Sequence, residues 1–442
     1  MFEKSGNKTI KFCNFHVLIT ALITIMLKTF FMKALKTTVP LSLLVSVLAL
    51  MAGCQNSAKP DLAGRYRGVI ESPGGELAFP ITIAKTDSGY TGYVSNGTDT
   101  LSFSDIKAGP DSVSLDFSFY DSHLIAAVQP NGDLRGRWTK HSIGTRILNL
   151  PFHAEKGVTY RYPRKSTDAG LFDGKWPTTF TTADSSHSYP ATGEFYTDNG
   201  KLYGTFLTET GDFRFLQGYA QDSTMTLSTF DGAHVFLFKG HLQKDGTIKG
   251  DFWSYTSHDT WTAKKGSNEL RNPFAIAKID PQHPDITFKL PDVNGHMISS
   301  NDPQFRGKPI LLYIFGTWCP NCADETAMLR QMYSKYKNTD LKIVGVAFEY
   351  FDSFKQKAEM VRRYQKRFNI PWTLVIGGKA EANDVLSSLP FVQKLISYPT
   401  AYFAGPDHAI KYIHVGFNGP GTGSYYFKEK KAFKEKIDDI TK

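Results

Sequence analysis

Two cysteines, Cys319 and Cys322, lie at the junction between a strand-like and a helix-like segment. The six apolar residues from Ile310 to Phe315 are typical of a strand buried in a parallel sheet. They lead through the tripeptide GTW into Cys319-Pro-Asn-Cys322. The following residues place one apolar face on a helix, formed by Met328, Leu329, Met332, Tyr333 and Tyr336. A CxxC pair at this position in a strand–helix alternation predicts a redox-active dithiol in an α/β domain.

The predicted position gives each cysteine a different chemistry. Cys319 would lie at a helix N-terminus, where free N–H groups and the helix dipole stabilise thiolate over thiol. Thiolate is the species that attacks a disulfide. Cys322, one turn further, is placed to attack the resulting mixed disulfide and release the product. Pro320 suits the first helical turn, which needs no N–H, and Trp318 would shield one side of the pair.

Other uses of the CxxC pair need residues that the sequence does not offer. A structural zinc site would need two more ligands of suitable spacing. A c-type haem site would need histidine after Cys322, where the chain has Ala323. A plain structural disulfide remains possible. The other two cysteines, Cys13 and Cys54, are too distant in sequence to suggest a disulfide framework.

The rest of the C-terminal third continues the strand–helix alternation after a polar linker from Lys264 to His283. We expect one α/β domain over 283–442. The predicted strands, besides Ile310–Phe315, are Lys342–Phe348, Trp372–Ile376, Thr400–Phe403 and Lys411–Phe417, and the predicted later helices are Ser353–Phe368 and Tyr426–Ile440.

Residues from about 285 to 440 carry a specific set of motifs. Besides the sequence WCPNC, the set consists of Phe288, Leu290, Asp292, Gly295, Gly307-Lys308 and Tyr398-Pro399-Thr400. In these motifs the segment resembles the TlpA/ResA-type thioredoxin-like proteins, which are exported disulfide reductases tethered outside the cytoplasmic membrane. The resemblance does not extend to residues 61–265.

The resemblance implies roles for individual residues. Cys319 would be the nucleophile and Cys322 the resolving thiol, with Trp318 beside them and a cis Pro399 facing them. Glu325 matches an acidic residue implicated in tuning the thiols, and a buried carboxylate there could accept the proton of Cys322. An ordinary solvated acid in the first helical turn is the alternative for Glu325.

Some features depart from ordinary thioredoxins or bear on the direction of electron flow. Tyr313 stands where thioredoxins have a buried aspartate on the strand before the active site. The glycine-rich stretch from Gly419 to Gly423 is expected to shape a substrate groove. Strong oxidants of this fold hold a histidine between the cysteines, whereas this chain has uncharged Pro-Asn, which favours a reductase.

The N-terminus has the pattern of an export signal. Five of the nine net positive charges lie in residues 1–53, so the basic balance gives little support for nucleic-acid binding. From Met32 the chain has a short cationic start, an apolar run from Val39 to Met51, and then Ala-Gly-Cys54. This end resembles a lipobox, which would make Cys54 a diacylated N-terminus. An ordinary signal peptide or a membrane anchor is the alternative. We expect residues 54–60 to be a tether.

Between tether and linker the chain shows one pattern twice, about 110 residues apart. We call residues 61–156 the first β module and residues 171–265 the second β module. Short alternating segments broken by turn residues predict an antiparallel barrel or sandwich in each. The paired positions are Tyr66 with Trp176, His123 with His234, and Trp138 with Trp253. The aromatic residues would line a ligand cup or, more commonly, fill the cores. The paired histidines have no third metal ligand beside them.

Together these features predict a lipid-anchored thiol–disulfide oxidoreductase of the protein-disulfide reductase type. The site needs no cofactor or metal. The resemblance implies disulfides in exported proteins, such as apocytochrome c, as substrates and a membrane reductase as electron donor. The predicted location is the cell envelope, facing the periplasm, on the outer rather than the inner membrane. The alternative is a binding protein whose β modules capture a partner, with the dithiol domain as redox sensor. A peroxidase fits poorly, because peroxide-reducing relatives place their reactive cysteine in a different loop.

Overall fold

The computed structural model describes residues 61–142, 146–163, 166–168 and 170–442. The predicted export signal, the lipidation site Cys54 and the tether lie outside these residues. Within the described ranges, no helix is both long and apolar enough to cross a membrane.

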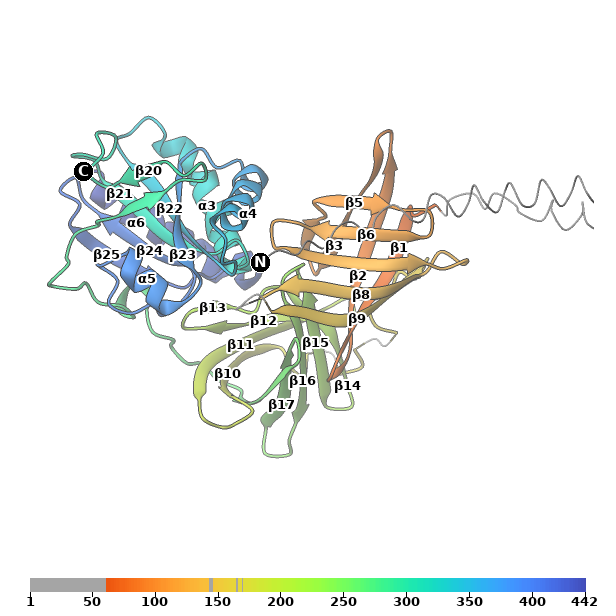
Figure 1. Cartoon of the computed structure of the whole chain (residues 1–442). Helices are drawn as coiled ribbons and strands as arrows, with labels where there is room; N and C mark the ends of the chain where they lie inside the picture. The colour runs from red at the N-terminus through yellow and green to blue at the C-terminus, as the bar shows by residue number, and fades with distance from the viewer. Residues whose placement is uncertain (1–60, 143–145, 164–165, 169) are drawn as a thin grey trace, which may run out of the picture. The chain divides into compact units, whose positions relative to one another are not determined.

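The first β module forms an antiparallel sheet of nine strands (Figure 1). The strand order is β4-β3-β2-β1-β9-β8-β7-β6-β5, and the end strands β4 and β5 do not pair with each other. In β9, alternate side chains from Leu148 to Ala154 are buried, as expected when one face of a sheet covers a core. The strands are β1 Gly64–Ser72, β2 Gly75–Thr86, β3 Gly89–Asn96, β4 Asp99–Ser102, β5 Asp105–Ala108, β6 Ser112–Phe117, β7 Ser122–Val128, β8 Leu134–His141 and β9 Ile147–Lys156.

The second β module is a closed barrel. Its sheet follows the order β11-β10-β18-β17-β16-β15-β14-β12, and pairing of β11 with β12 closes it, while the two-residue strand β13 adds to β12. The strands are β10 Gly174–Thr181, β11 Ser188–Asp198, β12 Lys201–Thr208, β13 Gly211–Asp212, β14 Leu216–Gln221, β15 Thr224–Phe230, β16 Val235–Leu242, β17 Thr247–Ser254 and β18 Ser257–Lys264.

Aromatic rings fill the inside of this barrel. Phe238 stacks on Phe252 with ring centroids 4.3 Å apart, and Phe206 lies 4.9 Å from Phe238 and 5.3 Å from Trp261. All four side chains are buried. Of the two roles predicted for the aromatic residues, these rings have the core-filling one.

Two of the three predicted pairs of the sequence repeat make similar contacts, whereas Trp138 is fully buried and its predicted partner Trp253 is only partly buried. The Tyr66 hydroxyl donates to the carbonyl four residues before it, at 2.8 Å, and the Trp176 indole N–H does the same at 2.7 Å. His123 lies 3.0 Å from a carboxylate oxygen of Asp116, while His234 lies 3.1 Å from one of Asp231. Among the described residues, no cluster of three or more metal-ligating side chains occurs.

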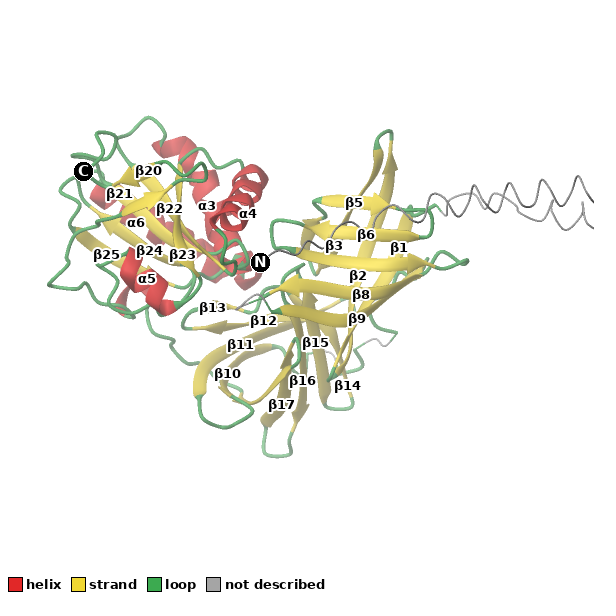
Figure 2. Cartoon of the chain, in the orientation of Figure 1, coloured by secondary structure: helices red, strands yellow, loops and turns green. Residues whose placement is uncertain are grey.

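The C-terminal domain is built on a five-stranded mixed sheet with helices packed around it (Figure 2). The order is β23-β22-β21-β24-β25. Strands β21, β22 and β23 are parallel, β24 pairs antiparallel with β21, and β25 pairs antiparallel with β24. The strands are β21 Ile310–Phe315, β22 Lys342–Glu349, β23 Thr373–Lys379, β24 Thr400–Ala404 and β25 Ile410–Val415, beside a hairpin of β19 Lys289–Pro291 and β20 Met297–Ser299. The helices are α3 Pro320–Tyr336, α4 Phe354–Phe368, α5 Ala382–Ser388 and α6 Ser424–Ile440, with 3-10 turns η2 Pro273–Ala275 and η3 Pro420–Thr422.

The predicted fold class, a duplicated all-β region followed by an α/β domain, is confirmed. All six residues of β21 are buried, as the continuous apolar run indicates. Helix α5 and the β19–β20 hairpin were not predicted. Their segments, of seven and three residues, are too short for a hydrophobic period to be recognised.

Candidate functional site

The two cysteines form a disulfide at the start of α3. Their Cα atoms are 5.3 Å apart. Cys319 is the N-cap residue of the helix, and its sulfur accepts the backbone N–H of Cys322 at 3.2 Å. Pro320 occupies the first helical turn. Cys319 is 6% exposed and Cys322 is fully buried, so of the two residues only Cys319 reaches the surface. This is the arrangement that favours thiolate at Cys319 after reduction.

The loop before β24 faces the disulfide. The Tyr398–Pro399 peptide bond is cis, and the Cys319 sulfur lies 3.7 Å from the carbonyl oxygen of Tyr398. The carbonyl of Pro399 accepts the N–H of Gly416 at 2.9 Å, which ties this loop to the end of β25. The structure thus brings the predicted residues Cys319 and Pro399 to one place.

Trp318 lies beside the pair, as its position in the sequence implies. Its indole N–H donates to the carbonyl of Phe348 at 3.0 Å. Its ring stacks on Tyr350 at 4.5 Å and meets Tyr398 edge-on at 5.1 Å. These contacts hold an apolar aromatic wall next to the disulfide.

The carboxyl group of Glu325 is fully buried, which excludes the solvated first-turn acid. Neither of its oxygens has a hydrogen-bond partner among the described residues. Burial raises the pKa of Glu325 well above its usual value, and the neighbouring Glu429 carboxylate raises it further. Glu429 itself lies 3.0 Å from the ring of the buried His414. Tyr313 is buried near this group, and its hydroxyl accepts the Trp372 indole N–H at 3.1 Å.

A second buried carboxyl group, Glu349, was not among the predicted site residues. It accepts the backbone N–H of Thr317 at 2.9 Å and the Thr317 hydroxyl at 2.7 Å, and so anchors the loop that carries the cysteines. Burial raises the pKa of Glu349 to about 8, against these two hydrogen bonds, which lower it. An acid directly after the buried run of β22, at the carboxyl end of a parallel strand, is the signal that could have identified it.

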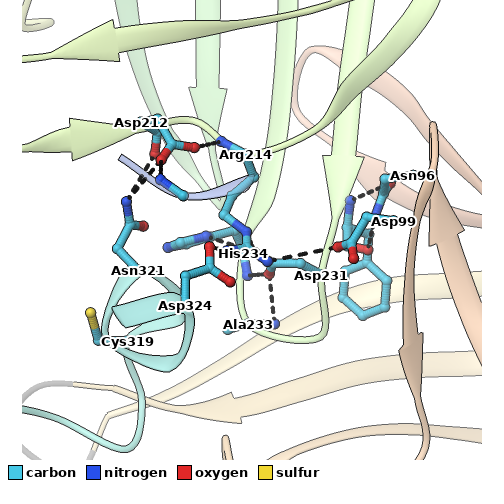
Figure 3. A network of polar contacts seen from close by, with 12 residues as sticks. Asn96, Asp99, Asp212, Arg214, Asp231, Ala233, His234, Cys319, Asn321 and Asp324 are labelled. Carbon is cyan, nitrogen blue, oxygen red and sulfur yellow. Dashed lines mark hydrogen bonds and ion pairs between the residues drawn. The ribbon is translucent and has the colours of Figure 1, made fainter. Parts of the chain in front are cut away.

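The β modules contribute side chains next to the dithiol (Figure 3). The Lys140 ammonium, from β8, donates to the carbonyl of Trp318 at 3.3 Å. Asn321, between the two cysteines, donates to the carbonyl of Phe417 at 3.1 Å and lies 3.5 Å from the Asp212 carboxylate. None of these contacts follows from the local sequence around the cysteines.

The glycine-rich stretch forms η3 and lines a cavity of about 280 Å³. The opposite side of the cavity is lined by Tyr196 and Tyr203 of the barrel, whose rings stack at 5.3 Å, and by Glu194. This stretch therefore lines a cavity together with residues of both β modules, and its role as a substrate groove stays a prediction.

Comparison with known proteins finds a family match within the C-terminal domain. Residues 281–413 match the family model described as AhpC/TSA family. The chain is similar to the thioredoxin-like protein YneN of Bacillus subtilis, with 28% identity over 135 residues that cover 30% of this chain and 70% of the relative. It is also similar to the thiol-disulfide oxidoreductase ResA of Geobacillus kaustophilus, with 25% identity over 129 residues, covering 29% of this chain and 66% of the relative.

Among solved structures, a thiol:disulfide interchange protein of Chlorobium tepidum matches with 18% identity and a TM-score of 0.28, covering 38% of this chain and 100% of that chain. The C-terminal domain of a putative thiol-disulfide oxidoreductase from Bacteroides thetaiotaomicron matches with 20% identity and a TM-score of 0.28, covering 38% and 97%. The family match and the relatives agree with the predicted resemblance: the C-terminal domain is similar to the AhpC/TSA family, to a thioredoxin-like protein and to proteins named thiol-disulfide oxidoreductases.

We predict that Glu349→Gln flattens the pH dependence of stability. With a folded pKa of about 8 and an ordinary value of 4.5, the unfolded chain loses this proton first as pH rises. The wild type therefore loses stability between about pH 4.5 and 8, by an amount on the order of 5 kcal/mol. The amide of the variant keeps an oxygen acceptor for Thr317 without that loss. Denaturant unfolding across this pH range measures the difference, with the exposed Glu359→Gln as control. Parallel curves for wild type and Glu349→Gln would contradict it.

Proposed function

We propose that this protein is a membrane-anchored protein-disulfide reductase. The observation that carries the proposal is the Cys319–Cys322 disulfide, which caps a helix N-terminus and faces a cis-proline loop. The uncharged Pro-Asn pair between the cysteines supports reduction rather than oxidation, because it adds no charge that would over-stabilise the thiolate.

The reaction is a two-electron exchange. In the reduced enzyme, the Cys319 thiolate attacks one sulfur of a substrate disulfide, and the other substrate sulfur leaves as a thiolate that takes up a proton. Cys322 then loses its proton and attacks Cys319, which releases the second substrate thiol and forms the enzyme disulfide. A dithiol donor must restore the pair, and a membrane reductase with an exposed dithiol is the class we propose.

Glu325 is the proposed acceptor for the proton that Cys322 loses. It lies three residues after Cys322 in α3, close to one helical turn, and its carboxyl group is buried without a hydrogen-bond partner among the described residues. A carboxylate with a raised pKa is a stronger base than an ordinary one, and its strength is better matched to a thiol.

The proposed setting is the cell envelope. Export through the N-terminal signal and diacylation of Cys54 would place the domain in the periplasm on a membrane, preferentially the outer one. The substrates would be disulfides of exported proteins, with apocytochrome c as the example that the family resemblance suggests. Export of the full-length protein and mass spectrometry of its N-terminal peptide test the anchor.

Cys322→Ser is expected to trap substrates on Cys319. Without the resolving thiol, the mixed disulfide cannot be released, so covalent adducts accumulate on non-reducing gels and disappear with dithiothreitol. Cys319→Ser is the matched control, because it lacks the attacking sulfur. An absence of adducts with Cys322→Ser, or equal adducts with Cys319→Ser, would contradict the proposed exchange.

Glu325→Gln is expected to slow release of the mixed disulfide by roughly 100-fold, since general-base catalysis contributes at least that much. Rising pH should restore part of the rate, because bulk deprotonation of Cys322 replaces the lost base. Alkylation of Cys319 should stay unchanged. Rapid-quench kinetics with a disulfide peptide measure the release step. An unchanged release rate, or a loss that pH does not relieve, would refute the base role.

The alternative function, capture of a partner by the β modules, is favoured by one observation. The 280 Å³ cavity beside η3 holds the stacked rings of Tyr196 and Tyr203, and Tyr196 is 53% exposed. One oxygen of Glu194, which lines the same cavity, is buried without a hydrogen-bond partner among the described residues. Aromatic faces with an acceptor suit a peptide segment, which offers N–H donors.

If the cavity captures substrate, Tyr196→Ala in the Cys322→Ser background lowers the yield of trapped adduct several-fold. Tyr93→Ala, another partly exposed tyrosine of a β module, is the matched control. Adduct yield quantified by mass spectrometry gives the readout. Equal yields for the two variants would show that the cavity takes no part in capture.

A further inference from the structure

A segment of the second β module contacts residues on several sides of the sulfur that must attack a substrate. This segment, Thr210–Arg214, lies between β12 and β14 and contains β13, and we call it the cap loop. Cys319 is 6% exposed. A substrate sulfur has to reach this atom in line with the bond that it breaks, and a residue with so little exposed surface offers little room for that approach.

The cap loop contacts three segments beside the disulfide, and Figure 3 shows its Asp212 next to Asn321. The carbonyl of Thr210 accepts the Ser397 hydroxyl at 3.3 Å, next to the cis-proline loop. The Asp212 carboxylate accepts the N–H of Gly419 at 2.7 Å, and it lies 3.5 Å from the Asn321 amide between the cysteines. Backbone and side-chain hydrogen bonds therefore hold the loop against the neighbours of Cys319.

Two glycines let the backbones come this close. A Cβ atom at Gly211 would lie 2.8 Å from the Asn321 amide nitrogen, and one at Gly416 would lie 2.4 Å from the backbone of Thr210. One glycine belongs to the cap loop and the other to the segment after β25. The sequence on both sides of the contact thus fits the covered arrangement.

An ion-pair network fastens the end of the cap loop. Arg214 is buried and forms an ion pair with Asp324, which lies two residues after Cys322. Its guanidinium also lies 3.3 Å from Asp231 of the same module and 3.7 Å from Asp99 of the first β module. Asp324 is the carboxylate through which this network reaches the dithiol helix.

We propose that the cap loop closes the active site in this state, and that substrates reach Cys319 only when the Arg214–Asp324 pair opens and the loop withdraws. The inference rests on the proposed function only in that a substrate has to reach Cys319. In this closed state Thr210–Asp212 of the same chain cover the face around Cys319. A substrate segment therefore competes with Thr210–Asp212 for that face.

Labelling of Cys319 by maleimides of two sizes tests the cap. N-ethylmaleimide and a maleimide on a long polyethylene-glycol chain share one thiolate chemistry, so the ratio of their rates reports steric access and not thiol acidity. The full-length protein is reduced and desalted, and peptide mapping isolates Cys319 from the other cysteines. Asp324→Asn leaves Arg214 paired with Asp99 and Asp231 but removes the ion pair between Arg214 and α3.

We expect Asp324→Asn to raise the ratio of large-reagent to small-reagent rate by about tenfold. Gly211→Ala, whose methyl group would press on Asn321, should act in the same direction by a different route. The matched control is Asp340→Asn, which breaks the surface pair with Lys308 in the same domain. Circular dichroism verifies that each variant is folded.

An unchanged ratio in both folded cap variants would overturn the proposal, as would a wild-type ratio equal to that of an unstructured cysteine peptide. The measurement needs no disulfide substrate and no turnover. If the protein reduces no disulfides but shows the expected labelling ratios, the proposed function fails and the cap proposal holds. If it reduces disulfides but the labelling ratios do not change, only the cap proposal is refuted.

Discussion

One buried cation sets how the described segments meet. The guanidinium of Arg214 is buried away from water, and this burial costs free energy unless carboxylates surround the charge. Asp99 of the first β module, Asp231 of the barrel and Asp324 of α3 supply that charge. Burial opposes ionisation of Asp231, yet His234 and Arg214 keep its pKa below the usual range. Since all three acids must converge on one side chain, the network links both modules to the helix that carries the dithiol.

Around the disulfide, hydrogen bonds position the reacting groups, and burial raises the pKa values of two carboxyl groups. Glu349 fixes the loop before the cysteines, and the N-cap geometry of Cys319 aims its sulfur at the helix N–H groups. Glu325 is buried on α3. On the neighbouring strand β21, Tyr313 stands at the position where thioredoxins have an aspartate. The acid that we propose as base for the second thiol is thus carried by α3 and not by β21.

The dithiol and its setting could be predicted from the sequence because their signals are local. An apolar run, a CxxC pair and a helical period follow one another from Ile310 to Tyr336, and the Tyr398-Pro399 pair is a short motif. Glu349 and Lys140 escaped prediction because they reach the site through the fold, from the end of β22 and from β8. Alternation of apolar residues predicted strands but not the β11–β12 pairing that closes one barrel, since register between distant strands has no local signature.

Closure of only one module has a consequence for self-association. A closed barrel exposes no free ladder of backbone groups, whereas the open sheet of the first β module ends in β4 and β5. Both end strands are four residues long, and β5 carries the charged side chains of Asp105 and Lys107. Short, charged edges are poor templates for a strand of another chain. The duplicated region therefore retains one open copy without offering neighbouring molecules a long strand on which to polymerise.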